Sequence, residues 1–405
     1  YTALSNLRAN KMRSALTMLG VIIGVSAVII MVSIVEGARS KVVQEFERLG
    51  SSLIIVAYDP RKAQEAKSTR RLPGLTMDDV RAIREQCDLV SGLSAELPVG
   101  DDLIARYYDA EMKVSVRGVQ PDFARLRNVN VARGRFISDE DVETWAKTVV
   151  IGSKVKGQLF GRAEAVGKDI DLQGVTATVV GVLEPKGRSG DEDTDKMIIA
   201  PITTIQKRFV GFEIVGMLWA QPTDAAVIGL AMDQIWECLM RRYQNAPGFQ
   251  VDSLENIQNA IGRVLSIFGL VLGGIAGLAL LVGGIGIMNI MLVSVTERTK
   301  EIGLRKAVGA RKRDILAQFL IESATVSGTG GIVGVGLGAG VAYIASAISQ
   351  QVMKNGIGGA GIPAHLPLWS ILGAFAFAAG VGVFFGLYPA IRAARLDPIE
   401  ALRHE

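Results

Sequence analysis

The sequence predicts an α-helical membrane protein with four transmembrane helices and a large α+β extracytoplasmic domain of two subdomains. Three observations support this fold class. The mean hydropathy of +0.32 is high for a chain in which 21% of the residues are charged. The apolar residues gather in long uncharged runs, and the segment between two of these runs alternates helix-like with strand-like patterns. A hydrophobic content of 49% and only two cysteines exclude a disordered chain and a disulfide scaffold.

Each predicted span is a run without Asp, Glu, Lys or Arg. A helix of roughly 20 apolar residues crosses about 30 Å of hydrocarbon, and every run is at least that long. The first run has a second interpretation, a cleaved signal peptide. Its apolar part is too long for that, and no small-residue cleavage site follows it. The predicted transmembrane helices are residues 14–35, 264–296, 323–353 and 366–391.

The distribution of basic residues predicts which side of the membrane each segment occupies, because Lys and Arg are enriched in cytoplasmic loops. The short loop 354–365 has one basic residue and is predicted to be external, as is the long segment 36–263. A sequence pI near 9.0 then reflects topology and nearness to anionic lipids, and it does not indicate nucleic-acid binding. The predicted cytoplasmic segments are the amphipathic N-terminal segment 1–13, the loop 297–322 and the tail 392–405.

Both ends of the segment 36–263 continue the helical pattern of the adjoining spans. Val42, Phe46 and Leu49 have helical spacing before a glycine, and Leu254 and Ile257 have the same spacing before the second span. At 1.5 Å per residue, a first helix running to Leu49 stands roughly 20 Å above the bilayer. The second uncharged run is longer than the hydrocarbon is thick. We therefore expect it to pack against a neighbouring chain.

The interior of the external segment alternates strand and helix signals. Residues 52–57 resemble a strand, and Thr76 with Asp79 forms a capping-box pattern that opens a helix. A further helix is predicted over about residues 223–243. Short β-branched runs predict a β-rich insert, about residues 106–200, inside a mixed α/β subdomain. These runs are residues 113–119, 148–151, 175–182 and 197–200.

Two motifs in this segment fall short of known ligand sites. The stretch from Gly161 through Gly167 has five residues between the glycines where a phosphate loop has four, and it lacks the Ser or Thr after Lys168, so it predicts a turn. The calcium-loop spacing of Asp191, Asp193 and Asp195 lacks the required glycine and the final glutamate, so residues 184–196 are predicted to be a solvated mobile loop.

Residues suited to catalysis or metal binding are scarce. His365 and His404 have no Cys or carboxylate cluster around them, and no nucleophile elbow is present. The sequence therefore predicts no catalytic site and no metal site. Cys87 and Cys238 both lie in the predicted external segment, where a disulfide is permitted, but the sequence leaves open whether they pair.

Small residues recur four positions apart along the predicted spans, which lets helix backbones approach closely in lipid. The general abundance of glycine in membrane helices accounts for part of this pattern. An interhelical hydrogen bond from Asn289 would contribute about 0.6–2 kcal/mol. Except for Glu322 at a span edge, charges are absent, which argues against an ion-coupled transporter or a channel. The predicted packing residues are Gly20, Gly24, Gly273, Gly277, Asn289, Gly334, Gly338, Gly382 and Gly386.

The loop between the second and third spans mixes many charges with a few apolar residues. Such a short amphipathic element suits docking into a groove on a partner protein. Its second interpretation is topogenic charge beside lipid. Gly303 and Gly309 are expected to break or cap a helix there. The candidate docking residues are Glu297, Arg298, Glu301, Ile302, Gly303, Leu304, Arg305, Lys306, Val308 and Gly309.

At this loop the sequence resembles the FtsX-like permease superfamily. The resemblance rests on ERTKEIGLRKAVGA at 297–310, GGIGIMNIM at 283–291, NKMRSALTMLG at 10–20 and YPAIRAARLDPIEAL at 388–402. Among members of that superfamily, the chain is most similar to the MacB type of ABC transporter permease. The resemblance covers the whole chain, including a single large external domain after the first span.

This resemblance implies a non-catalytic permease, expected as a homodimer, that works with a cytoplasmic ABC ATPase. ATP and Mg would bind the ATPase, and no cofactor is expected in this chain. The loop 297–322 would act as the coupling helix, and ATP hydrolysis would move the external domain, a mechanism called mechanotransmission. The implied outcome is export of a drug, peptide or other periplasmic substrate from the inner membrane. A periplasmic adaptor and an outer-membrane channel are further partners consistent with the resemblance.

One departure from the family concerns the ATPase. Full MacB proteins carry an ATPase domain in the same chain, and this sequence has none, so the ATPase is expected on a separate subunit unless the sequence has been trimmed. Three alternatives remain open. They are a lipoprotein-releasing complex, an FtsX-like regulator of a cell-wall hydrolase, and a membrane-anchored sensor that needs no ATPase.

Overall fold

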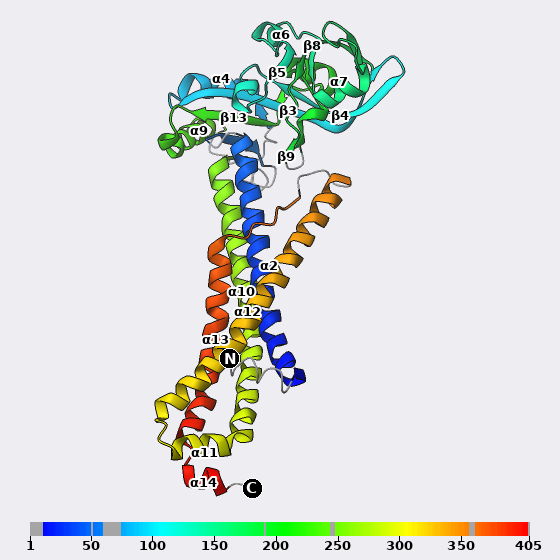
Figure 1. Ribbon diagram of the computed structural model, residues 1–405. Helices are drawn as coiled ribbons and strands as arrows, with labels where there is room; N and C mark the ends of the chain where they lie inside the picture. The colour runs from blue at the N-terminus through cyan, green and yellow to red at the C-terminus, as the bar shows by residue number, and fades with distance from the viewer. Residues whose placement is uncertain are drawn as a thin grey trace. The chain divides into compact units, whose positions relative to one another are not determined.

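The computed structural model describes residues 11–49, 52–59, 74–189, 192–243, 248–355 and 361–403 (Figure 1). The chain divides into two compact units. The membrane unit comprises residues 1–41, 262–357 and 361–405, and the external unit comprises residues 42–261 and 358–360.

Four helices in the described part of the chain are long and apolar enough to cross a membrane. The first three predicted spans lie inside these helices, and the fourth, residues 366–391, begins two residues before its helix, which starts at Leu368. The first is one continuous helix to Leu49, and the second begins at Leu254, so the predicted helical extensions of both spans are confirmed. The helices are α2 (Lys11–Leu49), α10 (Leu254–Glu297), α12 (Lys312–Asn355) and α13 (Leu368–Arg395). The described part of the membrane unit also contains two short helices, α11 (Thr299–Ala307) and α14 (Pro398–Arg403).

A mixed sheet forms the centre of the external unit. Its strand order is β14-β1-β13-β3-β4-β11-β6-β8-β5, and β7 pairs with β3 and β8. The strands are β1 (Ile54–Tyr58), β3 (Val90–Tyr107), β4 (Ala110–Val119), β5 (Val131–Gly134), β6 (Thr148–Ile151), β7 (Asp169–Leu172), β8 (Val175–Leu183), β11 (Met197–Pro201), β13 (Met217–Pro222) and β14 (Phe249–Ser253). Two small ribbons pair β2 (Leu75–Thr76) with β12 (Ile214–Val215), and β9 (Arg188–Ser189) with β10 (Glu192–Asp193).

Short helices cover this sheet. They are α4 (Met77–Gln86), α5 (Phe123–Leu126), α6 (Asp139–Glu143), α7 (Ser153–Phe160), α8 (Ile202–Ile205) and α9 (Ile228–Arg242), with single helical turns at Thr194–Lys196, Gln206–Val210 and Ala225–Val227. The four predicted β-branched runs are all strands, and the predicted helix near 223–243 is present as α9.

Strand β3 belongs to both parts of the external unit. Its first half, Val90 to Glu96, pairs with β13, and the stretch from Glu96 to Tyr107 pairs with β4, with shifts of register near Gly100. The predicted start of the β-rich insert, near residue 106, falls at the tip of the β3–β4 hairpin. The backbone hydrogen bonds of one sheet are therefore continuous across the two predicted subdomains.

The strands that adjoin α2 and α10 are neighbours in the sheet. β1 pairs antiparallel with β14, from Ile54 opposite Ser253 to Tyr58 opposite Phe249. The backbone N–H of Leu254, the first residue of α10, donates to the carbonyl oxygen of Leu53 at 3.0 Å. Phe46 at the end of α2 and Leu254 belong to one apolar cluster. The external ends of both long helices are thus joined to adjacent backbone strands.

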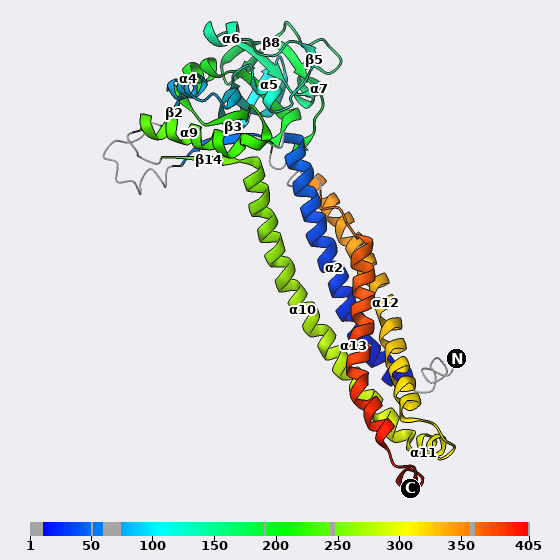
Figure 2. The same ribbon diagram turned by 90° about the vertical axis from the view of Figure 1, so that its left-hand side faces the viewer.

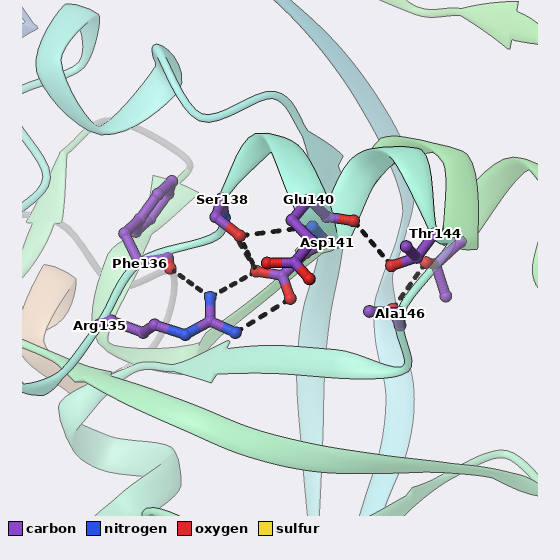
Figure 3. A network of polar contacts seen from close by, with 8 residues as sticks. Arg135, Phe136, Ser138, Glu140, Asp141, Thr144 and Ala146 are labelled. Carbon is purple, nitrogen blue, oxygen red and sulfur yellow. Dashed lines mark hydrogen bonds and ion pairs between the residues drawn. The ribbon is translucent and has the colours of Figure 1, made fainter.

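Two capping boxes fix short helices of the external unit. At α4 the Asp79 carboxylate accepts from the Thr76 backbone N–H at 2.9 Å and from the Thr76 hydroxyl at 3.0 Å, as the sequence predicts. At α6 the Asp141 carboxylate accepts from the Ser138 backbone N–H at 2.9 Å and pairs with the Arg135 guanidinium, as Figure 3 shows. This pairing holds the pKa of the Asp141 carboxyl at about 2.

The two incomplete ligand motifs have structural roles. Gly161 and Gly167 both have positive φ angles, of 55° and 84°, in the turn between α7 and β7, so the predicted turn is confirmed. The expectation of a solvated mobile loop around Asp195 is wrong. Asp195 is only 6% exposed, and its carboxylate accepts from the backbone N–H groups of Lys186 and Gly187 at 3.0 and 3.2 Å. Asp191 lies outside the described residues.

Candidate functional site between the second and third membrane helices

The candidate docking loop folds as the helix α11, which connects α10 to α12 (Figure 2). Gly303 lies inside this helix, so the expectation that it breaks the helix is wrong. A Cβ atom at Gly303 would lie 2.7 Å from the Cβ of Ala401 on α14, so glycine permits the two helices to touch. Gly309 follows the helix with a φ of +106°, a conformation that favours glycine and ends α11.

One face of α11 packs into the membrane unit. Ile302 is 3% exposed and shares a core with Ala390 and Ala394 of α13. The Lys306 ammonium donates to the carbonyl oxygens of Ala394 at 2.6 Å and Leu396 at 2.7 Å. These carbonyls lie at the end of α13, where the last C=O groups have no partner within the helix. Burial lowers the pKa of the Lys306 side chain.

Ion pairs and a hydrogen bond tie the charged side of α11 to itself and to α12. Arg305 pairs with Glu301 at 2.6 Å and donates to the amide oxygen of Gln318 on α12 at 2.6 Å. Arg298 pairs with Glu322 on α12 at 3.5 Å, and both side chains are largely buried. Glu322, which directly precedes the third predicted span, therefore has a basic partner.

The opposite side of α11 presents apolar side chains without cover from the described chain. Leu304 is 58% exposed and Val308 is 84% exposed. Ile399 on α14, which packs against α11, is 76% exposed. We name Leu304, Val308 and Ile399 the apolar surface patch. Basic residues that are also exposed lie near it in sequence, namely Lys300, Arg311, Lys312 and Arg313.

The candidate docking residues thus fall into those that face the protein interior and those that face outward. Ile302, Gly303 and Lys306 face the protein interior, and Leu304 and Val308 face outward. Glu297, Arg298, Glu301 and Arg305 take part in polar contacts within the chain. Among the described candidate docking residues, the outward apolar pair and the exposed charged residues are accessible to a partner.

Helix α14 is the part of this site that the sequence analysis missed. Its signal is local. Pro398 occupies the first turn of the helix, and the Asp397 side chain accepts from the Ile399 backbone N–H at 2.8 Å, an N-cap arrangement. The sequence Asp-Pro-Ile-Glu-Ala-Leu could therefore have predicted a short helix in the cytoplasmic tail.

Six of the predicted packing residues lie at close helix contacts. A Cβ at Gly20 of α2 would lie 2.7 Å from the Cα of Gly283 on α10, and one at Gly24 would lie 2.6 Å from the Leu280 side chain. On α12, Gly334 and Gly338 face Val25 and Ile29 of α2 at 2.8 and 2.9 Å. Gly382 and Gly386 of α13 face Ser327 and Ser323 of α12. A larger side chain at any of these positions would force the helices apart.

The remaining packing residues, all on α10, are not in close contacts within the chain. A Cβ at Gly277 would meet nothing within 4 Å, and one at Gly273 would meet only the end of Met31 at 3.9 Å. Asn289 is exposed and forms no side-chain hydrogen bond with the described residues, which differs from the expected interhelical bond. The neighbouring residues Leu270 and Val282 are 79% and 69% exposed. No described residue of the chain therefore covers this side of α10.

Comparison with known proteins gives two family matches. The model described as the MacB-like periplasmic core domain matches residues 14–237, and the model described as the FtsX-like permease C-terminal matches residues 263–398. The first match covers more than half of the chain.

Similar curated proteins share these two regions. The macrolide export ATP-binding/permease protein MacB of Bdellovibrio bacteriovorus is 38% identical over 413 residues, covering 100% of this chain and 61% of that protein. The pyoverdine export ATP-binding/permease protein PvdT of Pseudomonas entomophila is 36% identical over 98% of this chain and 58% of its own length. The chain thus spans about 60% of the length of these relatives.

A solved structure, the periplasmic region of MacB from Actinobacillus actinomycetemcomitans, matches 55% of this chain and 97% of its own length, at 15% identity and a TM-score of 0.45. Together, the family matches and the apolar helices describe an inner-membrane protein with a periplasmic domain. The chain belongs to the MacB-type family of ABC transporter permeases, with a MacB-like periplasmic core domain followed by an FtsX-like permease domain.

Proposed function

We propose that this chain is the permease part of an exporter in which a cytoplasmic ABC ATPase moves the periplasmic domain. The observation that carries the proposal is the apolar surface patch. Leu304 and Val308 are exposed on a helix whose other faces are fixed by α12, α13 and α14. An apolar pair held on a fixed helix suits insertion into a groove of a partner.

The coupling path in this proposal is built from continuous helices. An ATPase that binds two arrangements of the membrane helices with different affinity would shift the balance between them. In sequence, α10 directly follows β14 and is followed by α11, and α2 is followed by β1. Because β1 and β14 are paired, a change in the spacing of α2 and α10 would act on one sheet.

Export is favoured over the alternatives by the relatives. The Bdellovibrio and Pseudomonas proteins are named as exporters of a macrolide and of pyoverdine. We propose a drug, a peptide or a comparable periplasmic molecule as the substrate, with a periplasmic adaptor and an outer-membrane channel as further partners. The lipoprotein-releasing and hydrolase-regulating readings are outcomes that a search for periplasmic partners would reveal.

The proposal also places both termini and α11 on the cytoplasmic side and the external unit in the periplasm. Protease added to intact spheroplasts tests this placement. Cleavage within residues 52–253 is expected, with no cleavage near α11. Cleavage near α11 from outside would overturn the placement and the docking role with it.

A second experiment tests the docking role directly. The full chain is isolated from its native membranes, and the eluate is assayed for a bound ATPase and for ATP hydrolysis. The double variant Leu304→Asp/Val308→Asp is expected to lose at least tenfold of the bound ATPase and of transport. The matched control is Phe212→Asp, because Phe212 is an apolar residue of the external unit that is 70% exposed. Equal ATPase capture by the double variant and the control would contradict the proposal.

A further inference from the structure

The only two cysteines of the chain meet in the core of the external unit. Cys87 is the C-terminal capping residue of α4, and Cys238 lies on α9, about 150 residues later in the sequence. They are 3% and 1% exposed, respectively, and are reduced in the structure. Two cysteines so distant in sequence share one site because α4 packs against α9 (Figure 1).

Contacts between α4 and α9 hold the cysteines together. The Cys238 thiol lies 3.7 Å from the side-chain oxygen of Gln86, the residue before Cys87, and both cysteines belong to one apolar core cluster. Near the other end of α4, Asp79 accepts from Arg242 at 2.8 Å and from the Tyr243 hydroxyl at 2.5 Å. The two helices are therefore joined at both ends of α4, and the thiols face each other across a packed interface.

We propose that Cys87 and Cys238 form a disulfide that staples α4 to α9 when the external unit folds in the periplasm. Each thiol gives up one proton and one electron, and a bond forms between the sulfur atoms. The electrons and protons reduce the disulfide of a thiol–disulfide oxidoreductase to a dithiol. Disulfides persist in the bacterial periplasm, which is kept oxidising.

The burial of both thiols in the folded unit indicates that the disulfide forms before folding is complete. Burial raises the pKa of the Cys87 thiol to about 12 and also raises that of Cys238. The thiolate is the form that attacks a disulfide, so both groups are unreactive once α4 and α9 have packed. The oxidoreductase therefore acts on the exposed cysteines before the interface closes, and the finished disulfide is protected from reduction.

The link would enclose most of the sheet, because β3 through β13 lie between the two cysteines in sequence. A cross-link that closes so long a loop restricts the unfolded chain strongly. In this arrangement the disulfide stabilises the external unit without touching the membrane helices. The inference rests on the periplasmic location of the external unit and is independent of the ATPase docking site.

The test uses the full chain produced in a bacterium with an oxidising periplasm. Membranes are denatured in excess N-ethylmaleimide and digested without reductant, and the cysteine peptides are identified by mass spectrometry. A linked pair of peptides containing Cys87 and Cys238, lighter than the two thiol peptides by two hydrogens, is expected. Two alkylated cysteine peptides in place of the linked pair would overturn the proposal.

A stability measurement gives a second readout. Reductant added during a denaturing preincubation, which exposes the buried disulfide, is expected to lower the melting temperature of the external unit in the purified full chain by roughly 5–15 °C. The double variant Cys87→Ala/Cys238→Ala is the matched control, and reductant should leave its melting temperature unchanged. The proposal would also be overturned if the wild-type chain, after a denaturing preincubation with reductant, kept the melting temperature of the untreated chain.

Discussion

The Lys306 ammonium on α11 lies 2.6 Å from the carbonyl oxygen of Ala394, near the last turn of α13. A second donor hydrogen reaches the Leu396 carbonyl at 2.7 Å. One side chain thus joins the helix that follows the second span to the end of the fourth span. A basic residue at a helix C-terminus satisfies free carbonyls and interacts favourably with the helix dipole.

Replacing this lysine should loosen α11 and leave the external unit intact. Lys306→Met leaves two partly buried carbonyls without a donor, and such a loss costs about 1–3 kcal/mol. We expect faster hydrogen exchange of the α11 backbone amides in the purified full chain, with unchanged exchange in β6 and β11. Lys300→Met is the control, because Lys300 is exposed on the same helix. Equal exchange in the two variants would show that Lys306 does not fix α11.

The contact between α2 and α10 at Gly20 and Gly283 leaves no room for a side chain. Gly20→Leu forces the two backbones apart, and overpacking of this kind costs about 1–3 kcal/mol. The expected result is a lower melting temperature of the full chain in detergent. Gly277→Leu is the comparison, because a Cβ at Gly277 meets nothing within 4 Å in the single chain. A larger loss of stability in monomeric Gly277→Leu than in Gly20→Leu would contradict this packing.

The open side of α10 makes a separate prediction about assembly. In lipid, close packing of small residues drives helix association. If a second copy packs on Gly273 and Gly277, Gly277→Leu should weaken dimerisation at least tenfold, or about 1.4 kcal/mol. Energy transfer between labelled copies in lipid nanodiscs measures this change. Unchanged energy transfer would place the interface between copies elsewhere.

Much of this fold could be predicted because its signals are local. The length of an uncharged run predicts a membrane span, and the pair Thr76 and Asp79 predicts the start of α4. The turn at Gly167 is predicted because the stretch lacks the Ser or Thr that a phosphate loop requires. The packing of α11 against α13 and α14 could not be predicted in the same way. Gly303 looks like a helix breaker in sequence, and its role depends on Ala401, which is almost one hundred positions away.

The charged residues of the loop show the same limit. Lys306 and Arg305 are adjacent basic residues in sequence, yet one caps α13 and the other binds α12. The rotation of α11 about its axis decides which side chain is buried, and neighbouring helices set that rotation. Likewise, the helical pattern around Asn289 predicts a partner, but α10 presents that residue to the surroundings of the single chain.

The lowered pKa of the Asp141 carboxyl predicts that the stability of the external unit depends on pH. Its pKa falls from 3.8 to about 2 on folding, first because of the Arg135 hydrogen bond. A carboxyl with a lowered folded pKa contributes stability that is present above pH 4 and is lost as the pH falls to about 2. Because Arg135 is half exposed, we expect this contribution to be only about 1–2 kcal/mol. Asp141→Asn should reduce the slope of stability between pH 4 and pH 2, measured by denaturant unfolding, and an unchanged slope would contradict this assignment.

The buried carboxylate of Glu96 supplies the strongest stability prediction. Glu96 is fully buried, pairs with Arg117 and accepts from the indole N–H of Trp219 at 2.5 Å. Breaking a buried ion pair costs about 3–5 kcal/mol, and the remaining 3.6 Å contact of Arg117 with Glu192 places the expected loss at the lower end of that range. Glu96→Ala should therefore lower the free energy of unfolding by that amount and shift the fluorescence of Trp219.

The exposed pair Lys113 and Asp102 in the same sheet, 3.3 Å apart with both side chains at least 70% exposed, gives the matched control. An ion pair in water contributes about 0–1 kcal/mol, since solvent and salt screen both charges. Lys113→Ala should therefore change the free energy of unfolding by less than about 1 kcal/mol. If the two variants lose similar stability, the carboxylate of Glu96 does not hold β3, β4 and β13 together, and the continuity of the sheet must rest on its backbone pairing alone.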